Sequence, residues 1–175
     1  MNKQTIIKTI TEKYQLFTQF VGGLNAEDYH FSYQNKWTAG QQLQHMILCT
    51  KSLSKAFAMG VPLIIQNFGQ TERAGLSQEK LSSLYTEQLL AGGKAPERFV
   101  PGPAAPDDAN RDTATLTALI KDLCSGIESL SEQELDSLLI PHPLLDKLTL
   151  REMLYNAITH VEHHHEQTKQ NLEHK

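Results

Sequence analysis

The stretch Asn156-Ala157-Ile158-Thr159-His160-Val161-Glu162-His163-His164-His165-Glu166-Gln167 is helical by its pattern. His160 and His164 are four residues apart in this stretch. That spacing turns an α-helix by about 40° and lifts it by about 6 Å, so both imidazoles are able to reach one divalent metal ion. The next questions are which way the helix faces and what supplies a third ligand.

One arc of this helix is largely apolar, at 100° of rotation per residue. The arc contains Met153, Ala157, Val161, His164 and Thr168, with His160 at its edge. Both histidines should therefore face the interior of a helical bundle or its rim. We expect the remaining polar side chains on the solvent side, namely Glu162, His163, His165 and Glu166. The alternative for the pair is two hydrogen-bonded histidines at the edge of a core, without a metal.

Apolar side chains recur at helical spacing elsewhere in the chain, and no stretch alternates as a β-strand does. We expect helices over residues 3–21, 38–57, 77–89, 112–127 and 150–172, four of them long, with a short helical turn from Ser131. Thr149 and Glu152 form a capping box at the last helix. Residues 92–110 hold four prolines and form a long connection, which we expect to wall or cover a pocket. The prediction is an all-α fold, an antiparallel four-helix bundle with additional short helices.

Composition limits the classes of function. A chain of 175 residues fits a single domain, which we place at residues 1–175. The net charge of −4, without a run of Lys or Arg, argues against binding to nucleic acid or to anionic membranes and favours a small molecule or a protein partner. The polar first twenty residues predict neither a signal peptide nor a membrane span, hence a cytoplasmic protein. Cys49 and Cys124 lack Cys-x-x-Cys spacing, so we expect packed thiols.

His45 is the best candidate for the third ligand. It lies among apolar neighbours in the helix predicted over residues 38–57, where a buried imidazole needs a partner for its nitrogens. A metal ion shared with His160 and His164 would provide one, and three imidazoles would leave a coordination position open for water or substrate. A hydrogen-bonded core histidine is the alternative. Cys49, one turn beyond His45, is a further ligand that nothing in the spacing requires.

Other polar residues near these histidines have candidate roles. Asn156 and Gln167 lie four residues before His160 and three after His164, where either amide would orient a ligand or a bound water. The spacing indicates no general base, although His163 and His142 are candidates. The residues around His160 are not the zincin His-Glu-x-x-His motif. Half of a ferritin-like pattern occurs at Glu27-x-x-His30, but in a predicted loop.

Three segments together resemble the DinB-like (DinB/YfiT-like) metal-dependent enzymes. They are Trp37-Thr38-Ala39-Gly40-Gln41-Gln42-Leu43-Gln44-His45, the pattern His160-x-x-x-His164-x-x-Gln167, and the segment from Pro141 to Leu154 that leads into the last helix. Related segments often carry glycine at the position of Asp146. The resemblance implies an antiparallel four-helix bundle, a divalent zinc or nickel ion held by His45, His160 and His164, and a homodimer.

The resemblance also implies classes of activity. Members of the family include hydrolases and transferases that use a low-molecular-weight thiol such as bacillithiol, mycothiol or glutathione as co-substrate. Our leading hypothesis is a metal-dependent enzyme that binds a thiol or water at the open metal position and attacks a small electrophile. A metal-binding or stress-response interaction protein without turnover is the second hypothesis. A bundle whose histidines bind no metal is the third.

Overall fold

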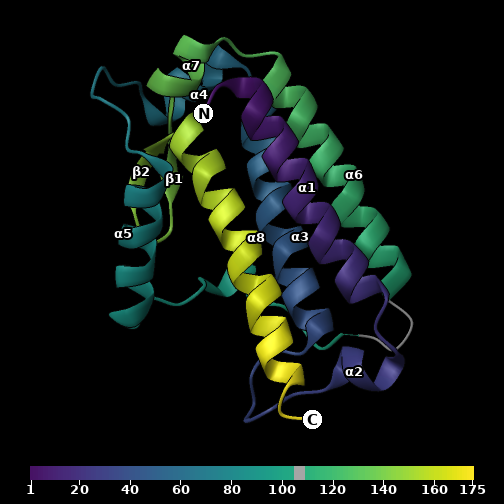
Figure 1. The fold of residues 1–175 in the computed structure, drawn as a ribbon. Helices are drawn as coiled ribbons and strands as arrows, with labels where there is room; N and C mark the ends of the chain where they lie inside the picture. The colour runs from purple at the N-terminus through teal and green to yellow at the C-terminus, as the bar shows by residue number, and fades with distance from the viewer. Residues whose placement is uncertain (105–108) are drawn as a thin grey trace.

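The computed structural model describes residues 1–104 and 109–175, and most of them are helical (Figure 1). The elements in chain order are α1 (Lys3–Gly22), α2 (Ala26–His30), α3 (Ala39–Phe57), α4 (Val61–Phe68), α5 (Gln78–Leu90), the 3-10 helix η1 (Glu97–Phe99), α6 (Ala109–Glu128), α7 (Glu132–Ser137), β1 (Leu139–His142), β2 (Asp146–Thr149) and α8 (Leu150–Leu172). The predicted all-α fold is confirmed, because the β-structure in the described residues is limited to one two-stranded hairpin and an isolated bridge between Gln70 and Leu138.

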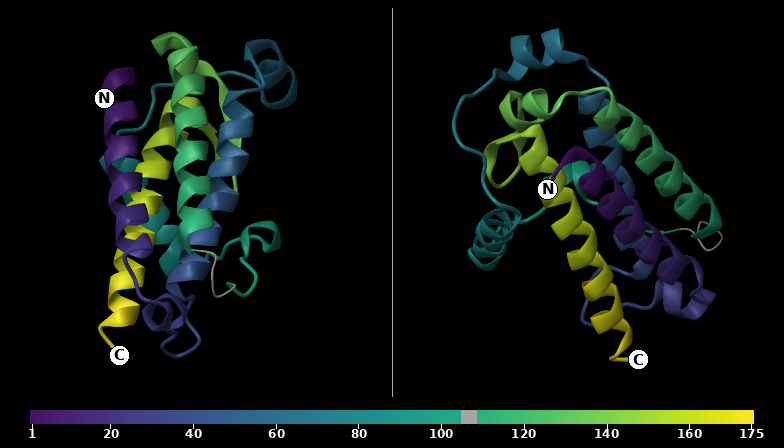
Figure 2. Two further views of the ribbon diagram at one scale, coloured as in Figure 1. Left: turned by 90° about the vertical axis from the view of Figure 1, so that its right-hand side faces the viewer. Right: turned by 45° about the horizontal axis from the view of Figure 1, so that its top comes forward.

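The bundle consists of α1, α3, α6 and α8 (Figures 1 and 2). Two neighbouring pairs run antiparallel. Gln42 near the start of α3 contacts Gln167 near the end of α8, and Gly22 at the end of α1 lies against Thr113 near the start of α6. The predicted helical bundle is therefore confirmed, and the antiparallel α3–α8 pair brings the two histidine-bearing helices together.

The other two neighbouring pairs run in the same direction. Lys13 of α1 forms an ion pair with Glu162 of α8 at 2.7 Å, while Met1, just before α1, binds Tyr155, about two turns before Glu162 on α8. Helices α3 and α6 also lie side by side and run in the same direction. The chain that connects the end of α3 to the start of α6 must therefore run back along the length of the bundle. Helix α5 and the segment that follows it make that return outside α8, and they form one wall of the site described below.

The bundle core is aliphatic and aromatic, as the helical periodicity predicts. Its fully buried large side chains include Ile6, Ile10, Phe17, Leu43, Met46, Leu116, Leu123 and Ile127. Helix starts are specified locally: Asn2, Thr38, Ser77, Ser131 and Thr149 each accept a backbone N–H of the first turn. The capping box predicted for Thr149 and Glu152 is present. The Glu152 carboxylate also accepts hydrogen bonds from both terminal guanidinium nitrogens of Arg73, each at 2.6 Å.

The β-hairpin was not predicted, and its physical basis is short and local. Leu139 pairs with Thr149 and His142 with Asp146, so each strand has only four residues and shows no clear alternation. Pro141 is tolerated because a two-stranded sheet demands no ladder bond to a third strand. Asp146 has φ of 58°, the left-handed conformation that glycine adopts without strain. This conformation explains why glycine suits the same turn in related segments.

Three shorter helical segments differ from the predicted boundaries. Residues 27–30 belong to α2, so the expected loop there is wrong; Asn25 caps this five-residue helix. Helix α3 ends at Phe57 as expected, but the Gly60-Val61-Pro62 sequence that follows begins α4, since proline is favourable in a first helical turn. The predicted connection over residues 92–110 contains η1, and α6 begins at Ala109. Residues 105–108 of that connection lie outside the described residues.

In the described parts of the chain, no single helix combines the length and the apolar composition needed to cross a membrane. Helices α3 and α4 meet these criteria only as a pair, and they are bent by 108° at the break between them.

Candidate metal centre

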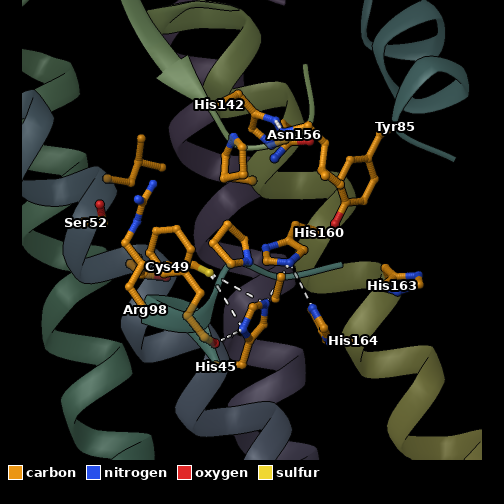
Figure 3. Close-up of a pocket in the computed structure, with 18 of the residues that line it drawn as sticks. His45, Cys49, Ser52, Tyr85, Arg98, His142, Asn156, His160, His163 and His164 are labelled. Atoms are coloured by element: carbon orange, nitrogen blue, oxygen red, sulfur yellow. Dashed lines mark hydrogen bonds between the residues drawn. The ribbon is translucent and has the colours of Figure 1, made fainter. Parts of the chain in front are cut away.

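Three histidines from α3 and α8 converge at the middle of the bundle (Figure 3). His160 Nε2 lies 3.2 Å from His45 Nε2 and 2.9 Å from His164 Nε2, and the three side chains offer ligand atoms that all lie within 4.8 Å of one another. His45 and His164 are buried, and His160 is half-buried at the cavity. The structure thus brings together the three residues singled out in the sequence, in a group compatible with a divalent metal site.

The ring of His45 is oriented by the backbone of η1. Its Nδ1–H donates to the carbonyl oxygen of Phe99 at 2.7 Å. A carbonyl oxygen only accepts, so Nδ1 carries the proton of the neutral ring and Nε2 presents a lone pair. A neutral imidazole held by an acceptor on its far nitrogen is the usual form of a histidine ligand.

The ring of His164 is oriented in the same way by a side chain. Its Nδ1–H donates to Gln42 Oε1, and Gln42 Nε2 in turn lies 3.5 Å from Gln167 Oε1. Gln42 is buried on α3, so the amide pair links both helices behind the histidine. Gln167, a predicted supporting residue, therefore acts through Gln42. Gln42 itself was not predicted, although it stands three residues before His45 in the motif.

The residues present fit a cation. The unprotonated Nε2 atoms of His45 and His164 both point at the Nε2 of His160. A single proton on His160 Nε2 cannot make a good hydrogen bond to both of these acceptors. A divalent ion accepts all three lone pairs at once. Burial, followed by the neighbouring imidazoles, lowers the pKa of His160 and His164 well below the usual range, and burial also lowers the pKa of His45. These rings are thus in the neutral form that binds metals.

Cys49 lies beside the three histidines but is not one of the converging group. Its Sγ is 3.6 Å from His45 Nε2. Burial raises the pKa of the Cys49 thiol to about 12. Because the thiolate is the form that binds a metal, the surroundings of Cys49 favour a neutral packed thiol. Cys124 is also a free, partly buried thiol, so both cysteines are packed thiols as expected.

Asn156 and His142 lie close together in the view of Figure 3, above the three histidines. Asn156, the other predicted supporting residue, makes no hydrogen bond to a histidine; its Oδ1 is buried without a partner in the described structure. His142 Nδ1 accepts the backbone N–H groups of Leu144 and Leu145, each at 3.1 Å. The proton of the neutral ring is therefore on Nε2, and burial lowers the pKa of His142 to about 4. His142 suits hydrogen-bond donation more than proton abstraction.

The expectation for the flanks of α8 is partly wrong. Glu162 and Glu166 are exposed as predicted, whereas His163 and His165 are half-buried. His165 packs on Phe20 of α1 with ring centroids 4.9 Å apart, and His163 lies 6.5 Å from the ring of Tyr85 on α5. The apolar arc of α8 alone does not indicate these contacts, because they depend on aromatic side chains from flanking helices.

A cavity of about 850 Å³ opens beside the three histidines. Its walls include aromatic and aliphatic side chains from α3, α5, the β-hairpin and residues 94–100, among them Trp37, Tyr85, Leu89, Phe99 and Ile140. The described part of the 92–110 connection thus forms a wall of the pocket, as expected. A space of this volume is large enough for a small organic molecule next to the histidine group.

A family model described as the DinB superfamily matches residues 9–168, a range that includes all three histidines. The chain has no match among curated proteins or among solved structures.

Proposed function

The chain belongs to the DinB superfamily, and from this premise we propose that it is a metal-dependent enzyme, a thiol-dependent S-transferase or a hydrolase acting on a small molecule. The observation that carries the proposal is the set of three imidazoles whose Nε2 atoms converge while a cavity of about 850 Å³ opens beside them. A closed structural site would have a fourth protein ligand and no such space.

In this proposal His45, His160 and His164 hold a divalent ion, with zinc or nickel the best candidates. When bound, such an ion lowers the pKa of a coordinated thiol or water and supplies a nucleophile near neutral pH. The chain's own residues have separate tasks. The Phe99 carbonyl and Gln42 keep two rings in the ligand tautomer. Trp37 and Tyr85 exclude water from the cavity wall.

Two further residues have proposed tasks at the substrate. The Nε2–H of His142 is available to hydrogen-bond a substrate oxygen, since Nδ1 is occupied by two backbone donors. His163 remains the candidate for accepting a proton, because it lines the cavity next to His164 and is partly open to solvent. Both tasks are proposals that substitution tests. His142→Gln keeps a hydrogen-bond donor and should retain most activity. His142→Leu has no donor and should lose most activity.

Elemental analysis tests the metal. Untagged protein, purified without chelator or metal-affinity resin, is compared with His160→Ala and with the matched control His174→Ala, which changes an exposed histidine at the end of the chain. About one equivalent of transition metal in the parent and in the control, lost in His160→Ala, supports the site. Assays for thiol transfer and hydrolysis then follow on loaded protein. Absence of metal in the parent after reconstitution would refute the proposal.

A further inference from the structure

The charged side chains around the cavity are all of one sign. Lys36, Lys55, Lys94 and Arg98 line it, and among the lining residues that the structure describes there is no aspartate or glutamate. The whole chain has the opposite balance, with 20 acidic residues against 16 Lys and Arg. A concave site with charges of one sign focuses its field on ligands of the other sign.

These four cations also lack acidic partners. Within residues 1–104 and 109–175, none of them forms an ion pair, whereas other surface lysines do, such as Lys13 with Glu162 at 2.7 Å. The Arg98 guanidinium lies 4.8 Å from the centroid of the Phe99 ring, and the Lys36 ammonium lies 6.0 Å from that of Tyr33. Their charges are thus available to a ligand that enters the cavity.

One of these cations is linked to the histidine group through the backbone. Arg98 precedes Phe99, whose carbonyl oxygen accepts the Nδ1–H of His45. Figure 3 shows Arg98 beside Cys49 and His45, at the side of the cavity formed by the residue 94–100 segment. A positive charge therefore lies next in the chain to the residue that orients His45, on the wall of the same cavity.

From these observations we propose that the cavity takes an anionic small molecule with an apolar body. The anionic end, a carboxylate or a similar group, contacts the cationic side chains Lys36, Lys55, Lys94 and Arg98, and the body lies against Trp37, Tyr85 and Phe99. The proposal rests on the proposed function in one respect, that the reacting end faces the three histidines. The preference for an anion does not itself require a metal.

Binding of three probes of one shape tests the proposal: 4-phenylbutyrate, 4-phenylbutanol and 4-phenylbutylammonium. Their dissociation constants are measured by calorimetry with metal-free and with metal-loaded protein. Emission from Trp37 locates binding in this cavity, because it is the chain's single tryptophan and lines the wall. We expect the anion to bind roughly tenfold more tightly than the cation in both forms, since several weak exposed-charge interactions act together. High salt should reduce the ratio.

The double variant Lys94→Gln/Arg98→Gln removes two charges from the cavity. The matched control Lys51→Gln/Lys121→Gln removes two exposed charges elsewhere, on α3 and α6. We expect the cavity variant to lose most of the preference for the anion while its binding of the neutral alcohol changes by less than about twofold. The control should keep the preference.

The outcomes separate this proposal from the proposed function. A preference for the anion in metal-free protein that disappears in the cavity variant supports the cationic site, whatever the metal analysis shows. A preference seen only in metal-loaded protein and retained in the cavity variant means that the metal binds the carboxylate, which overturns the cationic site and supports the metal. Equal affinities for the anion and the cation, or no binding of any probe at millimolar concentration, also overturn it.

Discussion

The indole ring of Trp37 lies 5.0 Å from the imidazole ring of His45, centroid to centroid, and 6.2 Å from that of His164. Trp37 is the only tryptophan of the chain, so in the absence of a cavity ligand its emission reports on the surroundings of the histidine group. Ions with open d shells, such as Ni²⁺ or Cu²⁺, should quench this emission strongly and saturate at one equivalent. Zn²⁺, with a filled d shell, should bind with little quenching and then block the quenching by Ni²⁺.

The matched variant for that titration is His164→Ala, which keeps Trp37 and removes one ligand. Quenching in the variant should need a large excess of Ni²⁺. Stoichiometric quenching of His164→Ala would show that the ion near Trp37 is bound elsewhere.

Gln42→Leu should weaken metal binding by about 10- to 100-fold, because it leaves the Nδ1–H of His164 without an acceptor and frees the ring to turn. Competition with a chromogenic chelator measures the affinity. Gln42→Glu keeps a hydrogen-bond acceptor at the same place and should retain most of the parent's metal affinity. Gln44→Leu, on another face of α3, is the control and should bind metal like the parent. Equal affinity in Gln42→Leu would remove any orienting role for this amide.

Metal-free protein should lose stability as the pH falls from about 6.5 to about 4. Burial lowers the pKa of His142 from 6.5 to about 4, and it also lowers the pKa values of His45, His160 and His164. In this range the unfolded chain binds more protons than the folded one, so protons favour unfolding. The free energy of unfolding, measured in urea at several pH values, checks the slope.

A single substitution tests the contribution of one ring to that slope. His142→Leu should flatten it by up to about 1.4 kcal/mol per pH unit, the value for one proton. An unchanged slope would mean that the pKa of His142 is the same in the folded and the unfolded state.

Arg73→Met should destabilise the fold by about 3 kcal/mol, because it removes two hydrogen bonds from a carboxylate that is 1% exposed. Burial raises the pKa of Glu152, but the bonds from Arg73 and from the backbone outweigh it and hold the pKa below 4.5. The carboxylate therefore stabilises the fold above pH 4.5, and this stabilisation is lost as the pH falls through the lowered pKa. The difference between parent and variant, measured in urea, should shrink over that range.

Gly40→Ala should cost about 1 to 3 kcal/mol in the free energy of unfolding. A Cβ at Gly40 would lie 2.5 Å from Tyr29 Cε1 and 2.6 Å from Ala104 Cβ, so α2 and the segment before α6 would have to move. Gly75→Ala is the control, since nothing lies within 4 Å of its added carbon. Urea unfolding compares the two. Equal stability of both variants would show that α2 packs loosely against α3.

Much of the fold follows from local signals in the chain. Apolar side chains at 3.6-residue spacing predict the four long helices of the bundle and α5, and Thr149 with Glu152 marks the start of α8 within one residue. The three converging histidines were also predictable, since a buried imidazole at His45 requires a polar partner and the pair on α8 offers one. Residues this far apart in sequence become neighbours because two amphipathic helices bury their arcs against each other.

The remaining features depend on packing that one sequence does not reveal. Gln42 and Gln44 look equivalent along the chain, and only the crossing of α3 and α8 decides which one meets His164. The hairpin consists of four-residue strands with a proline in one of them, too short for a period-2 pattern to appear. The tautomer of His142 depends on two backbone N–H groups in the hairpin turn.

The separation of the ligands along the chain has a consequence for biosynthesis. His45 leaves the ribosome before His160, which follows it by 115 residues along the chain. Until then the nascent chain has only one member of the group, and one imidazole holds a divalent ion weakly. If the three histidines hold a metal ion as proposed, loading of the site must follow the emergence of α8.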